Sequence, residues 1–208
     1  IQPVGEGIEV GALVTHWQLE RATLLHEKCT VLAEAASHIG GVQIRAMGTV
    51  GGNLGNASPA ADTIPPFLVF DAVVRLYSTA GEREIPLVDF LVGPGQTQRQ
   101  PDEIITGVLI PHCRPGAGSA FSRIARVAAD LAKVNAAACI ERDGDRIVDA
   151  RIALGSVART PVRVPGAEQL LIGQTYSLGL IGEASRAASS EIAPITDLRS
   201  SQQYRVSV

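Results

Sequence analysis

The sequence predicts an α+β fold with antiparallel sheets, and three observations lead to that class. Residues 72–77 and 84–87 alternate as strands around a turn at Gly81, and residues 134–142 and 146–154 do so around an Asp-Gly-Asp turn. Helical patterns lie in separate stretches, whereas a parallel fold would need them to alternate with single strands. The chain of 208 residues, 46% of them hydrophobic, is long enough for one domain or two small ones.

The first part of the chain contains a predicted strand followed by a helical region. Residues 8–14 have the composition of a short strand, and Thr15 to Gln18 has the Thr-x-x-Gln form of a capping box, which begins a helical turn. Apolar residues then recur near helical spacing over residues 24–38. This spacing predicts one amphipathic helix, ended by a Gly-Gly pair.

Later segments predict a boundary between two parts of the chain. A small apolar helix or turn is expected around residues 67–70, a loop rich in turn formers at 93–102, and a strand at 103–110. The stretch HCRPGAGSA, residues 112–120, has the composition of an interdomain connection, so we expect a boundary near residue 113. Beyond it, a strand and two helices are predicted, at 121–128, 166–171 and 178–189.

Composition argues against several classes of function. The formal net charge of −3, the single Trp and the lack of any Lys/Arg cluster argue against a nucleic-acid surface. There is no run of about 18 apolar residues and no signal peptide at the start of the sequence, so we expect a cytoplasmic protein without membrane insertion. The three cysteines and four histidines are scattered, so the cysteines are expected to be reduced thiols and no metal site is proposed.

The stretch TVGGNLGNASPAAD, residues 49–62, is the part of the sequence that most suggests a ligand. A Gly-Gly pair can adopt positive φ and gather consecutive N–H groups into a concave anion site, which suits phosphate. It is neither a P-loop nor a dinucleotide fingerprint, because no Lys-Ser/Thr follows and the spacing is G-x-x-G-G-x-x-G. The same composition also fits a plain structural loop, so the residues alone leave both interpretations open.

A resemblance to a known family begins at residues 47–76, MGTVGGNLGNASPAADTIPPFLVFDAVVRL. This segment resembles the signature of the FAD-binding subunit or domain of the molybdenum hydroxylases, the family of xanthine dehydrogenase and aerobic carbon monoxide dehydrogenase. Four further segments match the family pattern in the same order: GEREIPLVDFLVGPGQT (81–97), PDEIITGVLIP (101–111), SAFSRIARVAADLAKVNAAA (119–138) and DLRSSQQYR (197–205). The resemblance covers nearly the whole chain.

The resemblance implies FAD as the cofactor and assigns residues to it. In the family, the TxGGN turn wraps the FAD diphosphate, which implies that role for Thr49, Val50, Gly51, Gly52 and Asn53.

Five further positions carry over singly from the family. Asn56 matches a position that faces the cofactor, Asp62 an acidic residue that hydrogen-bonds FAD, and Ile105 an apolar residue that packs on it. Ile39 stands where some members have an aromatic residue, and Lys133 matches a lysine near the flavin, where a cation can stabilise negative charge on the reduced ring. Taken singly, Asp62 could be a helix N-cap, Lys133 a surface lysine and the two isoleucines core residues, so only the combination carries the assignment.

The resemblance also implies a domain organisation. Residues 1–112 would be the second half of a PCMH-type FAD-binding domain, and residues 113–208 an antiparallel-sheet-plus-helices domain like the C-terminal domain of the CO dehydrogenase flavoprotein. The family has another phosphate loop, of AGGT/S type, that would precede Ile8, and a helical stretch beyond the tyrosine that matches Tyr204. We therefore expect a piece of a longer flavin subunit, truncated at both ends and lacking the first phosphate loop.

The implied function is electron transfer in an oxidoreductase complex. The chain would take electrons from a [2Fe-2S] small subunit, pass them through FAD to NAD, a quinone or oxygen, and assemble with a molybdopterin large subunit. The flavin does the redox chemistry, so no residue is assigned as a catalytic acid or base. Two alternatives stay open: a noncatalytic docking or assembly fragment that no longer binds FAD, and a flavin reductase similar to the nucleotide-sugar reductases.

Overall fold

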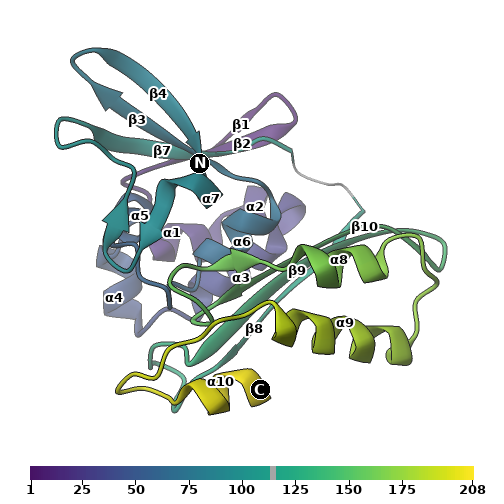
Figure 1. Ribbon diagram of the computed structural model, residues 1–208. Helices are drawn as coiled ribbons and strands as arrows, with labels where there is room; N and C mark the ends of the chain where they lie inside the picture. The colour runs from purple at the N-terminus through teal and green to yellow at the C-terminus, as the bar shows by residue number, and fades with distance from the viewer. Residues whose placement is uncertain (113–115) are drawn as a thin grey trace.

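The computed structural model describes residues 1–112 and 116–208 and shows two antiparallel sheets with helices between and beside them (Figure 1). The predicted α+β class is therefore confirmed. The predicted boundary near residue 113 falls outside the described residues. Among the described residues, no helix is long and apolar enough to cross a membrane.

The first sheet has five strands and contains the first predicted hairpin, which is confirmed. Its order is β1 (Gln2–Val4), β2 (Gly7–Gly11), β7 (Ile104–Ile110), β3 (Val73–Ser78) and β4 (Gly81–Pro86). The register places Val108 beside both Val10 and Val74, and all three side chains are fully buried. This row forms the sheet face that packs on the helices.

Seven short helices and a small hairpin complete the first part of the chain. They are α1 (His16–Arg21), α2 (Thr23–Lys28), α3 (Thr30–Ser37), α4 (Val42–Met47), α5 (Val50–Asn56), α6 (Ile64–Val69), α7 (Leu87–Phe90), β5 (Leu91–Gly93) and β6 (Gln96–Thr97). The predicted capping box is present, with Thr15 and Gln18 bonding reciprocally at the start of α1. The turn and second strand of the hairpin of β5 and β6 lie in residues 93–102, which were predicted as a loop.

The single helix predicted over residues 24–38 is wrong, because the chain breaks at Cys29. This residue has φ −145° and ψ 51°, which ends α2 and begins α3. Leu25, Cys29 and Leu32 are all fully buried, so both pieces direct their apolar sides into the same core. A periodic apolar pattern is equally consistent with a straight helix and with two helices that share a buried side.

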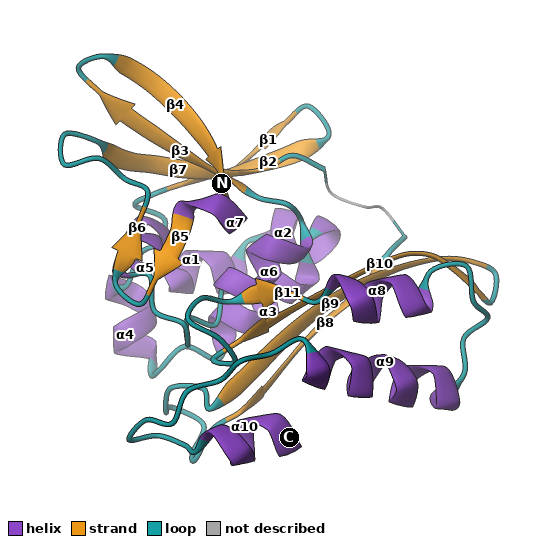
Figure 2. Ribbon diagram, viewed as in Figure 1, coloured by secondary structure: helices purple, strands orange, loops and turns teal. Residues whose placement is uncertain are grey.

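The second sheet has the order β11 (Val162–Arg163), β10 (Arg146–Gly155), β9 (Val134–Asp143) and β8 (Gly118–Ile124) (Figure 2). The second predicted hairpin is β9 and β10, and it is confirmed. One face carries α8 (Pro165–Leu171) and α9 (Leu178–Ser190), close to the predicted helices, and α10 (Gln202–Ser207) ends the chain.

Helix α6 lies between the two sheets and joins their cores. All six of its residues are buried, and Pro65 and Pro66 occupy its first turn, where their missing N–H groups cost nothing. It contacts β9 and β10, where Ala137 and Ala153 are paired and fully buried. Because these alanines belong to the same apolar cluster as the first sheet, one core extends across the molecule.

Candidate cofactor site

The glycine-rich run forms a helix and not the predicted loop. Thr49 is the N-cap of α5, and its Oγ1 accepts a hydrogen bond from the Gly52 N–H at 3.1 Å. Gly51, Gly52 and Gly55 lie within this helix, so the expectation that the glycine pair supplies positive φ is wrong. Glycine disfavours helix by up to about 1 kcal/mol per residue, so tertiary packing must decide the conformation here.

That packing is visible at Gly51. Its N–H donates to the Ala12 carbonyl at 2.8 Å, and the Val50 N–H donates to the Val14 carbonyl at 2.9 Å. A Cβ on Gly51 would lie 2.8 Å from the Ala12 Cβ and 3.0 Å from its carbonyl oxygen. Gly51 therefore permits the close approach of α5 to the segment that follows β2.

These bonds also correct the interpretation of the run as an anion-binding nest. With the Asn53 N–H donating to the Thr49 carbonyl at 2.9 Å, the amides of residues 50–53 all bond within the protein. The predicted group of free amides is therefore not present. Any contact with an anion at this place must come from side chains or must displace the Thr49 cap.

A cavity of about 330 Å³ lies along the exposed side of α5. Its wall includes Thr49, Gly51, Gly52 and Ile105 from the predicted set, together with Ala12, Leu13, Gly55, Arg99, Glu103 and Ile104. A Cβ on Gly55 would lie 3.6 Å from Ile105 Cδ1, at ordinary contact distance. The glycines thus leave space along this wall, and the structure brings these four predicted residues together.

Other residues of the predicted run are placed away from this wall. Val50 is buried in the core, and Asn53 Oδ1 accepts a hydrogen bond from Thr63 Oγ1 at 2.8 Å. Asn56 is exposed at the end of the helix. Ile39 is half-buried just after α3, where its carbonyl accepts from Arg45 Nη1 at 3.2 Å.

The cavity also contains a cation that the sequence analysis missed. Arg99 Nη1 donates to the carbonyls of Gln100 and Glu103 at 3.0 and 2.7 Å. Both acceptors are neutral, so Arg99 brings positive charge to the wall. Neighbouring Glu103 is bonded by Arg83 and the Gln100 N–H, which lower its pKa to about 2. The sequence analysis predicted only a loop over residues 93–102. The positive charge of Arg99 was the one feature that could have indicated an anion-binding role.

Asp62 is buried just before α6, with 5% of its surface exposed. Its Oδ1 accepts from Asn135 Nδ2 and its Oδ2 from Arg123 Nη1, each at 2.7 Å. Burial raises the pKa of Asp62, and the bonds from Asn135 and Arg123 oppose that rise. The predicted cofactor acceptor thus also bonds to two residues of the second sheet.

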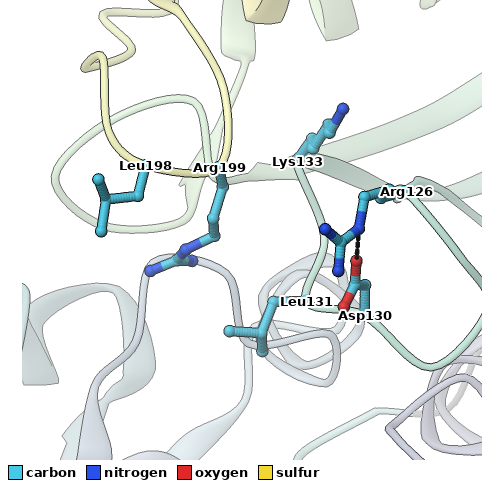
Figure 3. Close-up of a pocket in the computed structure, with 6 residues that line it drawn as sticks. All are labelled: Arg126, Asp130, Leu131, Lys133, Leu198 and Arg199. Carbon is cyan, nitrogen blue, oxygen red and sulfur yellow. Dashed lines mark hydrogen bonds and ion pairs between the residues drawn. The ribbon is translucent and has the colours of Figure 1, made fainter.

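A second cavity, of about 300 Å³, contains Lys133 (Figure 3). Figure 3 shows Arg126, Asp130, Leu131 and Lys133 on the segment between β8 and β9 and Leu198 and Arg199 on a loop near the C-terminus, with the Lys133 side chain directed away from the other five. The six residues include three cations and one anion, and Arg126 Nε pairs with Asp130 Oδ2 at 2.9 Å. The Lys133 ammonium lies 5.1 Å from the centre of the Tyr204 ring.

The chemistry of these walls fits an anionic dinucleotide. The first cavity offers a hydroxyl, a guanidinium and apolar side chains beside glycines that leave space, and the carboxylate in its wall, Glu103, is already bonded by Arg83. The second cavity is predominantly cationic. Phosphates require positive charge and hydrogen-bond donors, while a planar ring requires apolar contact. FAD combines both requirements, so the residues present fit it.

Two family models together match nearly the whole chain. Residues 1–113 match the FAD binding domain in molybdopterin dehydrogenase, and residues 119–208 match the CO dehydrogenase flavoprotein C-terminal domain. The class is therefore a flavoprotein that binds FAD.

Curated relatives from the same family match this chain over most of its length. The chain is 34% identical to the nicotine 6-hydroxylase medium subunit of Paenarthrobacter nicotinovorans, over 99% of this chain and 72% of the relative. It is 31% identical to the xanthine dehydrogenase FAD-binding subunit of Escherichia coli O157:H7, over 96% and 69%.

A solved structure shows the same fold. It is the carbon monoxide dehydrogenase of Hydrogenophaga pseudoflava that lacks the Mo-pyranopterin moiety of its molybdenum cofactor. The chain superposes on it with a TM-score of 0.95 and 28% identity, covering 100% of this chain and 72% of the other. The chain belongs to the family of FAD-binding medium subunits of molybdenum hydroxylases, so it is an oxidoreductase subunit.

Proposed function

We propose that this chain transfers electrons from the [2Fe-2S] clusters of a small partner subunit, through its FAD, to an external acceptor. A large molybdopterin subunit would complete the complex and bind the substrate. The names of the relatives support this, since they describe medium subunits of dehydrogenases and hydroxylases. When bound, the flavin supplies the redox chemistry, and the chain holds it, screens it and adjusts its charge environment.

The observation that carries the proposal is the cavity whose wall is formed by the glycines of α5 together with Ile105 and Arg99. We assign Thr49 and the exposed edge of Gly52 to the cofactor, with Arg99 supplying the charge that the engaged amides do not. Ile105 provides apolar contact at the same wall.

The other predicted residues have roles nearby in this proposal. Val50 and Asn53 hold the helix from behind, and Asn56 and Ile39 are assigned to the cofactor by the family resemblance alone. Asp62 accepts a hydrogen bond from the cofactor with a remaining lone pair, and Lys133 stabilises negative charge on the reduced ring. In this assignment residues 1–112 form the FAD-binding lobe and residues 113–208 the C-terminal flavoprotein lobe.

A substitution that fills the cavity tests the assignment. Gly55→Leu should place a side chain along the wall and weaken FAD binding by at least about tenfold, or ~1.4 kcal/mol. Gly179→Leu is the matched control, because Gly179 is also an exposed helical glycine and lies on remote α9. FAD affinity is measured by titration, with the flavin bands at roughly 370 and 450 nm as the readout. Equal affinity in the two variants would contradict the placement of FAD at this wall.

One observation favours a second candidate, a docking or assembly fragment that does not bind FAD. The amides of residues 50–53 are already bonded within the protein, so the anion site that the sequence predicts is not free. The same titration separates the two candidates. A colourless protein that takes up no FAD but still co-purifies with partner subunits would support the docking role.

A further inference from the structure

Arg123 is a buried arginine that joins three distant parts of the chain. It lies at the end of β8, and its side chain is 5% exposed. Its Nη1 donates to Asp62 Oδ2 at 2.7 Å and to the His38 carbonyl at 3.1 Å. Its Nη2 donates to the carbonyls of Ala128 and Asp130 at 2.8 and 2.6 Å. One guanidinium thus contacts the end of α3, the start of the α6 region and the segment between β8 and β9.

The segment that Arg123 holds has few anchors of its own. Residues 126–129 are exposed, as is Leu131, and Ala132 is the first fully buried residue after them. A local bond from the Asp130 N–H to the Val127 carbonyl, at 3.0 Å, shapes the turn. A segment with so little buried apolar surface opens easily unless polar contacts hold it.

This same segment forms one side of the cationic cavity. Arg126 and Asp130 are on it, and the Lys133 N–H closes it by donating to the Ile124 carbonyl at 2.7 Å. The carbonyl of Asp130 that Arg123 holds belongs to the residue whose carboxylate pairs with Arg126. Fixing this backbone therefore fixes the position of the carboxylate that pairs with Arg126.

The partner of Arg123 is itself held in one orientation. Asn135 on β9 donates to the other oxygen of Asp62, and a Cβ on Gly155 would collide with the Asn135 amide oxygen. The tight fit around Asn135 leaves the Asp62 carboxylate little freedom. Asp62 and the segment 126–131 are then linked rigidly through a single side chain, because a planar guanidinium donates in fixed directions.

We propose that Arg123 is a positioning residue of the flavin site. It links Asp62 to the segment 126–131, and so it sets the orientation of the Asp62 carboxylate and the backbone of that segment without touching FAD. This inference rests on the proposed function. Lysine can keep the charge beside Asp62, but an ammonium cannot reach the four acceptors that the guanidinium fork serves. Arg123→Lys therefore keeps the positive charge beside Asp62 but removes the hydrogen bonds that position the segment 126–131.

The test uses two measurements on the purified protein. Without cofactor, hydrogen exchange of the amides in residues 126–131 should quicken by about tenfold or more in Arg123→Lys. FAD should bind about tenfold or more weakly. Arg163→Gln is the matched control, because Arg163 also bonds across to the first part of the chain, at Asp71 (2.9 Å), and lines neither cavity. It should lower the unfolding temperature without altering either readout.

The outcomes separate this inference from the proposed function. Unchanged exchange and FAD affinity in Arg123→Lys, or the same changes in Arg163→Gln, would overturn the positioning role. A parent protein that binds no FAD would refute the proposed function, and the inference with it, whatever the exchange result. If Arg123→Lys is poorly folded, Arg123→Gln with Asp62→Asn removes the buried charge imbalance, and fast exchange in that pair supports the role while slow exchange refutes it.

Discussion

Gly51 shows how a motif can be identified correctly and interpreted wrongly. Its lack of a Cβ lets α5 approach the Ala12 backbone, and its N–H is used in that contact. The sequence predicted the site correctly as a place where glycine matters. It could not show that the group packed against Gly51 is Ala12 and not a ligand. Ala12 lies far from Gly51 in sequence, and only the fold brings the two residues together.

The role of Gly51 predicts a destabilising substitution. Gly51→Ala should lower the free energy of unfolding by about 1 to 3 kcal/mol, since the added methyl group meets main-chain atoms that cannot move aside. Gly179→Ala, on the exposed side of α9, should instead raise it by up to about 1 kcal/mol through helix propensity. Urea unfolding of both variants checks the contrast. An equal gain in stability for both would show that α5 is not tightly packed.

His16 makes stability depend on pH. It is buried in α1, its Nδ1 has no hydrogen-bond partner among the described residues, and burial lowers its pKa below the ordinary 6.5. The unfolded chain therefore binds a proton more readily than the folded protein does. The contribution of His16 to the free energy of unfolding is fully present above about pH 6.5 and is lost as the pH falls below that value.

The check on His16 compares unfolding free energies between about pH 7.5 and pH 5.5, on either side of the ordinary histidine pKa. The parent should lose more stability across that range than His16→Gln, which cannot titrate. Parallel curves for the two proteins would mean that the imidazole is protonated equally well in both states.

Helix α6 connects the second sheet to the apolar cluster that includes the first sheet. Its apolar sequence and paired prolines were enough to predict a small helix or turn, because proline is favoured in the first turn. Its position was not predictable, since an apolar run does not show which surfaces will cover it. By contrast, both hairpins were predicted because their turns and alternating strands are local in sequence.

Removing the largest side chain of α6 should affect both sheets together. Phe67→Ala leaves a cavity in the shared core and should cost about 3 to 5 kcal/mol. Fluorescence of Trp17 reports the first part of the chain, and far-ultraviolet circular dichroism reports all of it. Both signals should shift to the same lower denaturant concentration. Two separate transitions would show that the sheets unfold independently.

The fold class, the family and the cofactor were all predicted from the sequence, and the comparisons confirm them. What it did not predict were contacts between distant segments. Arg123 and Asp62 are 61 residues apart, and no local pattern marks them as partners. Arg99 was likewise visible as a residue but not as part of a wall, because Thr49 and Arg99 come together only through the fold.

The shared helix α6 limits how such subunits can be recombined. A chimaera that joins the first half of this chain to the second half of a relative would inherit a complete sequence match on each side. Its α6 would still have to pack against strands from the relative. In this chain, Phe67 and its neighbours pack against the small alanine side chains of β9 and β10. Exchange of halves therefore succeeds only when the donor carries similarly small residues at those positions.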